Sequence, residues 1–154
     1  MANYEFTSIS NVFKTKNDEQ VVNVFQSFGF EETYSNENGV FIGSYGEQML
    51  DDSMHVVLDK DDNVVATYDD YTFENLDDEV QNKLLDDNDK TYSVLTAEEY
   101  LQNMLLDGEV ITYKEVGHEK LRYNSAFGLV ISKYEIKAFS LDKLIEDYAE
   151  QMKK

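Results

Sequence analysis

An acidic block between residues 31 and 90 is the feature that most constrains how this chain can fold. The block holds 18 Asp and Glu residues against three Lys residues, which gives it −15 of the chain's net charge of −19. Residues 1–30 hold three acidic and two basic residues, and residues 91–154 hold 11 and eight. Because charge of one sign weakens a compact state by self-repulsion, a folded chain is expected to keep it for solubility or for a cationic partner.

Five pairs of adjacent aspartates recur in this block at intervals of eight to ten residues. We take them, with a neighbouring Tyr and Glu, as the candidate partner-binding residues. Tyrosine is included because it buries a large area at interfaces with little loss of conformational entropy. The candidates are Asp51, Asp52, Asp61, Asp62, Asp69, Asp70, Tyr71, Asp77, Asp78, Glu79, Asp86 and Asp87.

The composition predicts a globular protein. A length of 154 residues suits one domain, and 42% hydrophobic content supplies the core that disordered acidic tails lack. Cysteine is absent, which excludes disulfides, and no basic leader precedes an apolar run, so we expect a cytoplasmic protein of a bacterial host. An acidic surface is repelled by nucleic acid and anionic lipid, so we expect neither direct nucleic-acid binding nor membrane binding.

Local patterns in the first half predict a strand, a helix and two hairpins. Asn17, with Gln20 three residues later, is typical of a helix start, and Gly29 is expected to end that helix. Asn38-Gly39 can supply the positive φ of a tight turn. The expected strands are residues 4–9, the pair 30–34 and 40–45, and the pair 54–58 and 64–68.

In the second half, three further helices are expected. Asn75 is expected to cap the first, and Thr96 with Glu99 forms a capping box for the second, which Gly108 ends. Ser140 is expected to cap the third. The apolar stripe of the first is Leu76, Val80 and Leu84, and that of the last is Leu141, Leu144, Ile145, Tyr148 and Met152.

Strands 109–116 and 129–139, with a weaker one around Tyr123, are expected between the last two helices. The resulting order favours an α+β fold of mostly antiparallel sheet with about four helices, in a single compact domain spanning residues 1–154. A possible seam near residues 86–90 separates an acidic part, 1–90, from a charge-balanced part, 91–154. Arg122, the one arginine, is expected to form a salt bridge.

The sequence contains no recognisable catalytic motif. Of the two histidines, His55 is expected in a strand and His118 in a turn, and the segment 43–46 is interpreted as a flexible loop because its Gly-Ser-Tyr-Gly departs from the spacing of a nucleophile turn. The absence of a glycine-rich phosphate loop also removes one class of cofactor site. We therefore predict that the protein is not an enzyme and binds no cofactor.

The segment 59–63 places oxygen-bearing side chains at alternate positions, as a calcium loop does. Val64 stands where such a loop has glycine, and Asp70 where it has glutamate, so we interpret the segment as a polar hairpin turn. No metal site is predicted, although a divalent-metal-binding module remains the less favoured alternative.

The predicted hairpin 54–68 has dimensions compatible with DNA. Duplex DNA carries one negative charge per roughly 1.7 Å of its axis, and a five- or six-residue strand spans roughly 17–20 Å. Pairing of its strands would place Asp51, Asp52, Asp69 and Asp70 at one end of the ribbon, and Asp61 and Asp62 at the other. A partner that grips phosphates with Lys and Arg could accept such a surface, so we expect residues 47–87 to occupy a basic groove.

The acidic block resembles the DNA-mimic anti-CRISPR and anti-restriction inhibitors of phages and mobile elements. The residues that carry the resemblance are the Asp pairs from Asp51 to Asp87, with Glu31, Glu32, Glu37, Glu47 and Glu74. It implies a stoichiometric blocker of a basic nucleic-acid-binding protein, a CRISPR effector or restriction nuclease. An immunity-type protein that neutralises a basic toxin is the alternative, because the same electrostatics would serve it.

Overall fold

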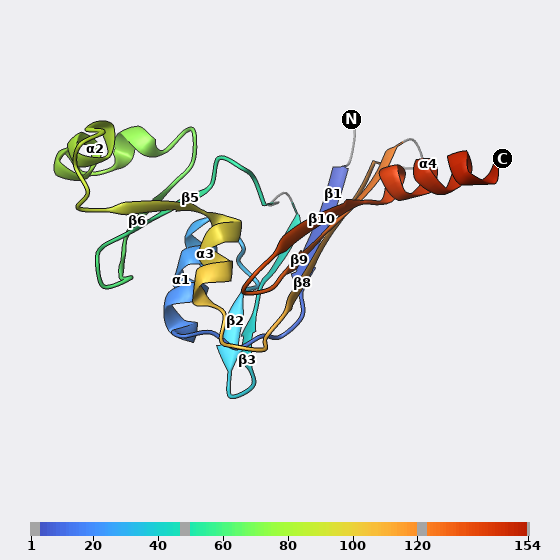
Figure 1. Cartoon of the computed structure of the whole chain (residues 1–154), viewed down its shortest axis with the longest axis horizontal. Helices are drawn as coiled ribbons and strands as arrows, with labels where there is room; N and C mark the ends of the chain where they lie inside the picture. Colours follow the sequence, from blue (N-terminus) through green and yellow to red (C-terminus); the bar gives the residue numbers. More distant parts are fainter. Residues whose placement is uncertain (1–3, 47–49, 120–122, 154) are drawn as a thin grey trace.

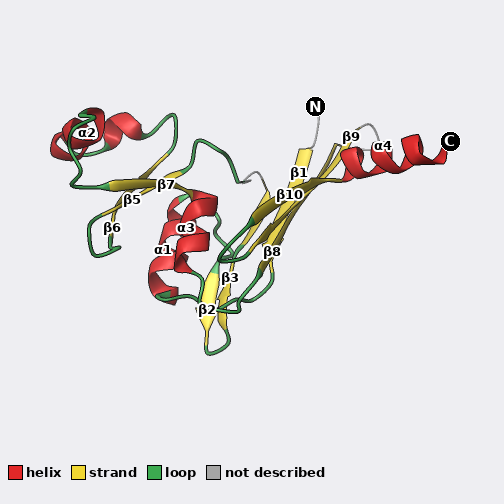
Figure 2. Cartoon of the chain, in the orientation of Figure 1, coloured by secondary structure: helices red, strands yellow, loops and turns green. Residues whose placement is uncertain are grey.

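Every strand pair in the computed structural model, which describes residues 4–46, 50–119 and 123–153, is antiparallel (Figure 1). These residues form a single α+β domain with three sheets and four α-helices (Figure 2). The fold class expected from the sequence is confirmed.

A five-stranded sheet forms the larger side of the molecule, with the strand order β10-β9-β8-β1-β4. Its strands are β1 (Tyr4–Ser10), β4 (Gly43–Gly46), β8 (Ile111–Glu119), β9 (Tyr123–Ile131) and β10 (Ile136–Ser140). A small hairpin consists of β2 (Tyr34–Asn36) and β3 (Gly39–Phe41). An isolated bridge between Phe13 and Val40 connects it to the segment that follows β1.

A second sheet, with the order β6-β5-β7, carries most of the acidic block. We define the acidic lobe as residues 51–96, which comprise β5 (His55–Leu58), β6 (Val64–Tyr68), the 3-10 helix η1 (Phe73–Asn75), α2 (Asp78–Leu85) and β7 (Ser93–Thr96). The lobe lies at one end of the molecule, and the last helix lies at the other end (Figure 1).

The core lies between the two sheets, where α1 (Asp18–Ser27) and α3 (Ala97–Met104) are placed. Phe25 contacts Phe28 and Phe30 edge to face, with ring centroids 6.1 and 5.6 Å apart. Both helices begin as expected: the Asn17 side chain accepts a hydrogen bond from the backbone N–H of Gln20, and Thr96 forms its capping box. These caps satisfy backbone donors that a helix start otherwise leaves free.

The last helix, α4 (Leu141–Met152), follows β10 directly and projects away from the sheet (Figure 1). Ser140 caps it as expected, accepting a hydrogen bond from the backbone N–H of Lys143. None of its residues is buried.

Two strand predictions need correction. The segment 40–45 is not one strand, because the chain passes from one sheet to another at Ile42, whose backbone N–H donates to the Ser10 hydroxyl. Residues 30–33 form a turn, and the strand begins only at Tyr34. The segment 129–139 is likewise two strands, β9 and β10, since Ser132 turns the chain by accepting hydrogen bonds from the next residues.

Two helix ends also differ from the prediction. Asn75 lies in η1 and caps nothing, because the Gln81 side chain binds the carbonyls of Glu74 and Leu76 and makes that turn separate from α2. Gly108 does not end α3. The helix stops at Met104, where Leu105 leaves to bridge with Thr15.

Candidate functional site

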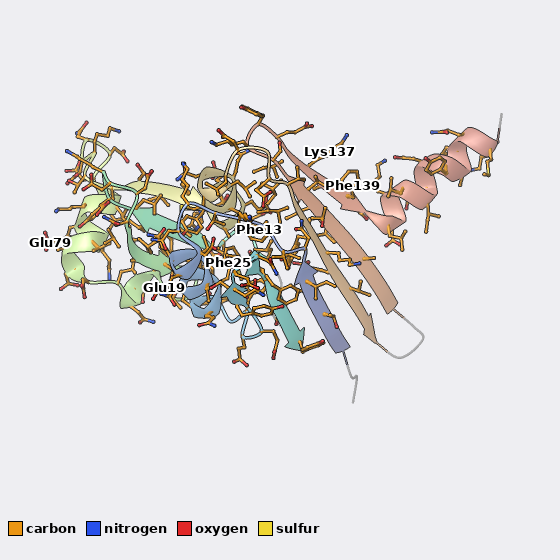
Figure 3. The ribbon with its side chains drawn as sticks, turned by 90° about the horizontal axis from the view of Figure 1, so that it is seen from below. Phe13, Glu19, Phe25, Glu79, Lys137 and Phe139 are labelled. Carbon is orange, nitrogen blue, oxygen red and sulfur yellow. The ribbon has the colours of Figure 1, made fainter. Side chains whose placement is uncertain are left out.

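The predicted partner-binding residues lie on the outside of the acidic lobe. Eleven of the twelve candidates are exposed, and Asp69 is half-buried. Tyr71 leaves 92% of its surface exposed beside Asp70. Glu79, on α2, lies at the end of the molecule farthest from Lys137 and Phe139 (Figure 3).

The register of β5 and β6 brings two of the aspartate pairs together. His55 lies opposite Tyr68, so the segments before β5 and after β6 meet at one end of the hairpin. Asp51-Asp52 and Asp69-Asp70 therefore share that end, and Asp61-Asp62 lies at the other, as predicted. A four-residue strand separates the two ends by roughly 13 Å.

Helix α2 connects the two charged ends. It begins after Asp77, downstream of the Asp69-Asp70 end, and the chain then returns to β7, where Ser93 lies opposite Leu58. Hydrogen bonds with Thr91 lower the pKa of Asp89, and the nearby ammonium groups of Lys83 and Lys60, which the return of the chain brings close, add to this effect. The carboxylates thus run along the lobe instead of meeting at one point.

The first aspartate of three pairs folds a turn. The carboxylates of Asp51, Asp69 and Asp86 each accept a hydrogen bond from the backbone N–H two residues later, at 2.8, 2.9 and 3.0 Å. Asp and Asn favour this geometry, the Asx turn, because their short side chains reach their own backbone. These three pairs therefore mark turns of the lobe.

The second aspartate of each of these pairs, Asp52, Asp70 or Asp87, is exposed. The sequence interpretation treated both members as equivalent and missed this division. A signal was present: Ser53 and Asn88 follow two residues after the first aspartate, and small polar residues are common in such turns. Asp59 was also missed as a structural residue, although it accepts backbone hydrogen bonds from Asp61 and Asn63.

Little positive charge compensates the lobe. Within its residues, all of which are described, the one ion pair joins Lys83 to Glu79 at 3.2 Å. The hydrogen bond with Glu79 raises the pKa of Lys83, whose ammonium also lies 5.3 Å from the centre of the Tyr92 ring. The other ion pairs of the described chain lie outside the lobe. Most lobe carboxylates therefore face solvent with no ion pair to a cation of the described residues.

The segment 59–63 uses its first carboxylate, that of Asp59, to fold the turn. The carboxylate of Asp59 turns to the backbone N–H groups of Asn63 and Asp61, which lower its pKa. No group of three or more His, Cys, Asp or Glu side chains in the described residues is placed to hold a metal ion. The metal-binding alternative has no support from this geometry.

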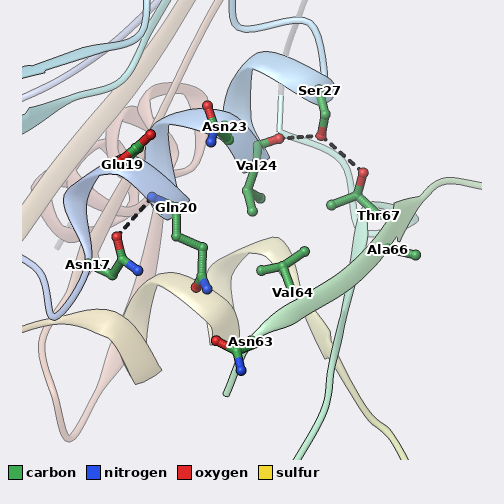
Figure 4. A pocket seen from close by; sticks show the side chains of 10 residues that line it. All are labelled: Asn17, Glu19, Gln20, Asn23, Val24, Ser27, Asn63, Val64, Ala66 and Thr67. Carbon is green, nitrogen blue, oxygen red and sulfur yellow. Dashed lines mark hydrogen bonds between the residues drawn. The ribbon is translucent and has the colours of Figure 1, made fainter. Parts of the chain in front are cut away.

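A cleft of about 500 Å³ separates the lobe from α1 (Figure 4). Two hydrogen bonds join the two parts: the Ser27 hydroxyl lies 3.0 Å from the Thr67 hydroxyl, and Gln20 Nε2 donates to the Asp62 carbonyl at 3.5 Å. Gln20 accepts a hydrogen bond from Tyr100. Amides, hydroxyls and the single carboxylate of Glu19 line it, so it offers no pair of acid and base groups.

The structure also shows where the two histidines and the segment 43–46 lie. His55 lies in β5, where its ring stacks on Tyr68 with centroids 5.1 Å apart. His118 belongs to β8 and not to a turn, because β8 continues to Glu119 in register with β9. The segment Gly43–Gly46 is a strand and not a flexible loop, because it pairs with β1. Arg122 and Glu47 lie outside the described residues.

Comparisons with protein-family models, with curated proteins and with solved structures find no match to this chain. Among the described residues, no helix has the length and apolar character needed to cross a membrane.

Proposed function

We propose that this protein is a non-enzymatic inhibitor that presents a DNA-like acidic surface to the nucleic-acid-binding groove of a bacterial defence nuclease. A CRISPR effector or a restriction enzyme is the class of target that fits best. Both act in the bacterial cytoplasm, where the inhibitor would meet them.

One observation carries this proposal: an ordered lobe at one end of the molecule holds exposed carboxylates with a single internal ion pair. The carboxylates are spread along a hairpin and a helix, as phosphates are spread along a duplex. A basic groove would pair with them through charge-assisted hydrogen bonds, and exposed Tyr71 would add apolar area.

The second aspartates of three pairs, Asp52, Asp70 and Asp87, together with Asp61, allow a sharp test, because they carry charge and none of their carboxylates folds an Asx turn. The variant Asp52→Asn, Asp61→Asn, Asp70→Asn and Asp87→Asn removes four charges, none from a carboxylate that holds an Asx turn. The tagged protein is used to capture bacterial proteins at about 50 and about 200 mM salt, a range over which phosphate-like contacts weaken steeply. The captured nuclease is then assayed for DNA cleavage.

We expect wild-type protein to inhibit cleavage and the four-Asn variant to lose inhibition. A matched control also removes four charges, all on α4 at the opposite end: Asp142→Asn, Glu146→Gln, Asp147→Asn and Glu150→Gln. It should inhibit as wild type does. Equal inhibition by both variants, or capture that does not weaken with salt, would reject the proposal.

Competition with nucleic acid separates a groove blocker from a toxin-neutralising protein. Duplex DNA or guide RNA should displace the inhibitor from its target, since both would occupy one groove. If neither competes, the lobe binds a different basic surface and the DNA-mimic mechanism is wrong.

A further inference from the structure

The apolar stripe of α4 has no partner within the described chain. Leu144, its most covered member, is 41% exposed, and Met152 is 82% exposed. The helix projects beyond the sheet (Figure 1). A twelve-residue helix is marginally stable in water on its own, because helices in proteins gain most of their stability by packing an apolar face.

The five-stranded sheet has an open face near the same end. Its other face buries Tyr113 and Leu129, against the core. On the open face, cross-strand register places Ile9, Lys114, Gly128 and Phe139 in one row across β1, β8, β9 and β10. In Figure 1, both α1 and α3 lie on the core side of this sheet.

A depression of about 410 Å³ opens in this row where Gly128 lacks a side chain. A Cβ built on Gly128 would meet only the Tyr113 carbonyl oxygen, at an ordinary 3.5 Å. Local packing therefore does not require glycine there. Glycine inside a strand often marks the close approach of another chain.

The charges of α4 and of the open sheet face indicate which partner each surface could bind. The rim of the depression carries Lys114 and, one row away, Lys137, in a protein whose net charge is −19. On α4, Asp142 lies beside the apolar stripe, and neither Asp142 nor Glu146 makes an ion pair among the described residues. The acidic helix and the lysine-bearing sheet face are thus complementary.

We propose that two copies of this chain associate, with α4 of each copy packed on the open sheet face of the other. One twofold axis would cover both surfaces at once, as an isologous interface requires. The acidic lobes lie at the opposite end, so they would point away from the interface and repel little (Figure 1). This inference does not depend on the identity of the lobe's target.

Sedimentation equilibrium of the full chain across a dilution series tests this arrangement. We expect wild-type protein to have twice the chain mass of 17.9 kDa. Leu144→Lys with Tyr148→Lys should raise the dimer dissociation constant at least about thirtyfold, the loss expected for hot-spot side chains. The control Asp147→Asn with Glu150→Gln changes the charge equally on the polar side of α4 and should remain dimeric.

Gly128→Val tests the sheet face separately. Valine favours strands and has room at this position, so the variant should fold with unchanged or higher thermal stability and yet be monomeric. A monomeric wild-type protein at every concentration would overturn the proposal. A wild-type dimer that survives Gly128→Val would overturn the helix-on-sheet arrangement, and one that survives the double lysine variant would overturn the role of α4.

Discussion

Glu115 is a carboxylate buried on the core side of β8. Its Oε1 accepts hydrogen bonds from the Leu50 backbone N–H at 2.7 Å and from the Tyr113 hydroxyl at 2.6 Å. Burial raises its pKa above the usual 4.5, and the two hydrogen bonds only partly oppose this effect. Half-buried Glu98 has a raised pKa for the same first reason, with the charges of Asp52 and Glu115 adding to it.

The raised pKa values of Glu115 and Glu98 determine how the stability of the fold changes with pH. Between the usual pKa and the raised one, the folded state holds more protons than the unfolded state, so stability falls as pH increases through this window. We expect urea denaturation to give a larger free energy of unfolding at pH 5 than at pH 7. Glu115→Gln keeps an oxygen for both donors, so it should reduce this difference. An unchanged pH dependence in that variant would contradict the assignment.

Glu115→Ala tests the hydrogen bonds at the same position. It removes the acceptor of the Leu50 N–H and of the Tyr113 hydroxyl, of which, among the described residues, only the hydroxyl has a second hydrogen bond, with Ser8. We expect a loss of about 1–3 kcal/mol in the free energy of unfolding, the cost of a buried polar group without a partner. A cost no larger than that of Glu115→Gln would show that the two bonds contribute little.

At the scale of elements, the β2–β3 hairpin depends on one glycine. Gly39 has a φ of +131°, and a Cβ there would lie 2.2 Å from the Phe13 carbonyl oxygen. Gly39→Ala should therefore lower the free energy of unfolding by about 3 kcal/mol, through strain and loss of the bridge between Phe13 and Val40. Thermal or urea denaturation measures it.

Gly108 provides the matched control. Its φ is +83°, but a Cβ would meet nothing within 4 Å. Gly108→Ala should cost only the strain of a left-handed residue, about 1–2 kcal/mol. Equal losses in the two variants would mean that the contact with Phe13 is unimportant.

Local patterns in the sequence predicted which segments form helices and strands better than they predicted which strands pair with each other. The caps at Asn17, Thr96 and Ser140, and the β5–β6 hairpin, could be predicted because each depends on residues close in the chain. The strand β7, and β4 as a strand separate from β3, could not. Each is four residues long and is defined by pairing with a strand distant in sequence, β1 or β5.

The same contrast holds for the candidate site: features that depend on nearby residues could be predicted, and features that depend on distant strand pairing could not. The exposure of the aspartates and their placement at the two ends of the hairpin could be predicted from charge and strand alternation. The return of Asp89 towards Lys60 could not, because it depends on β7 and on the path of α2. The two roles within each aspartate pair depend on turn geometry that composition alone does not reveal.

At the scale of the whole molecule, the charge of −19 acts as a destabilising field. Raising NaCl from about 0.01 M to about 0.1 M shortens the screening length from about 30 to about 10 Å. We expect this to raise the free energy of unfolding by about 1 kcal/mol, since exposed charge pairs contribute a few tenths each. Chemical denaturation at the two salt concentrations measures the gain.

The gain should be smaller in the four-Asn variant of the lobe than in the control variant at the opposite end. Both variants have the same net charge, so a difference between them reports where the repulsion is concentrated. Identical salt responses would indicate that the field is spread evenly over the surface.

The different roles of the two aspartates in a pair affect which substitutions this protein can tolerate during evolution. Folding of three turns depends on the leading residue of a pair, Asp51, Asp69 or Asp86, while the trailing residue is open to solvent. Under the proposed function, mutation of the trailing position can adjust the surface to a new target without loss of these turns. An inhibitor of the proposed kind could then follow changes in its target's groove by single substitutions at these exposed positions.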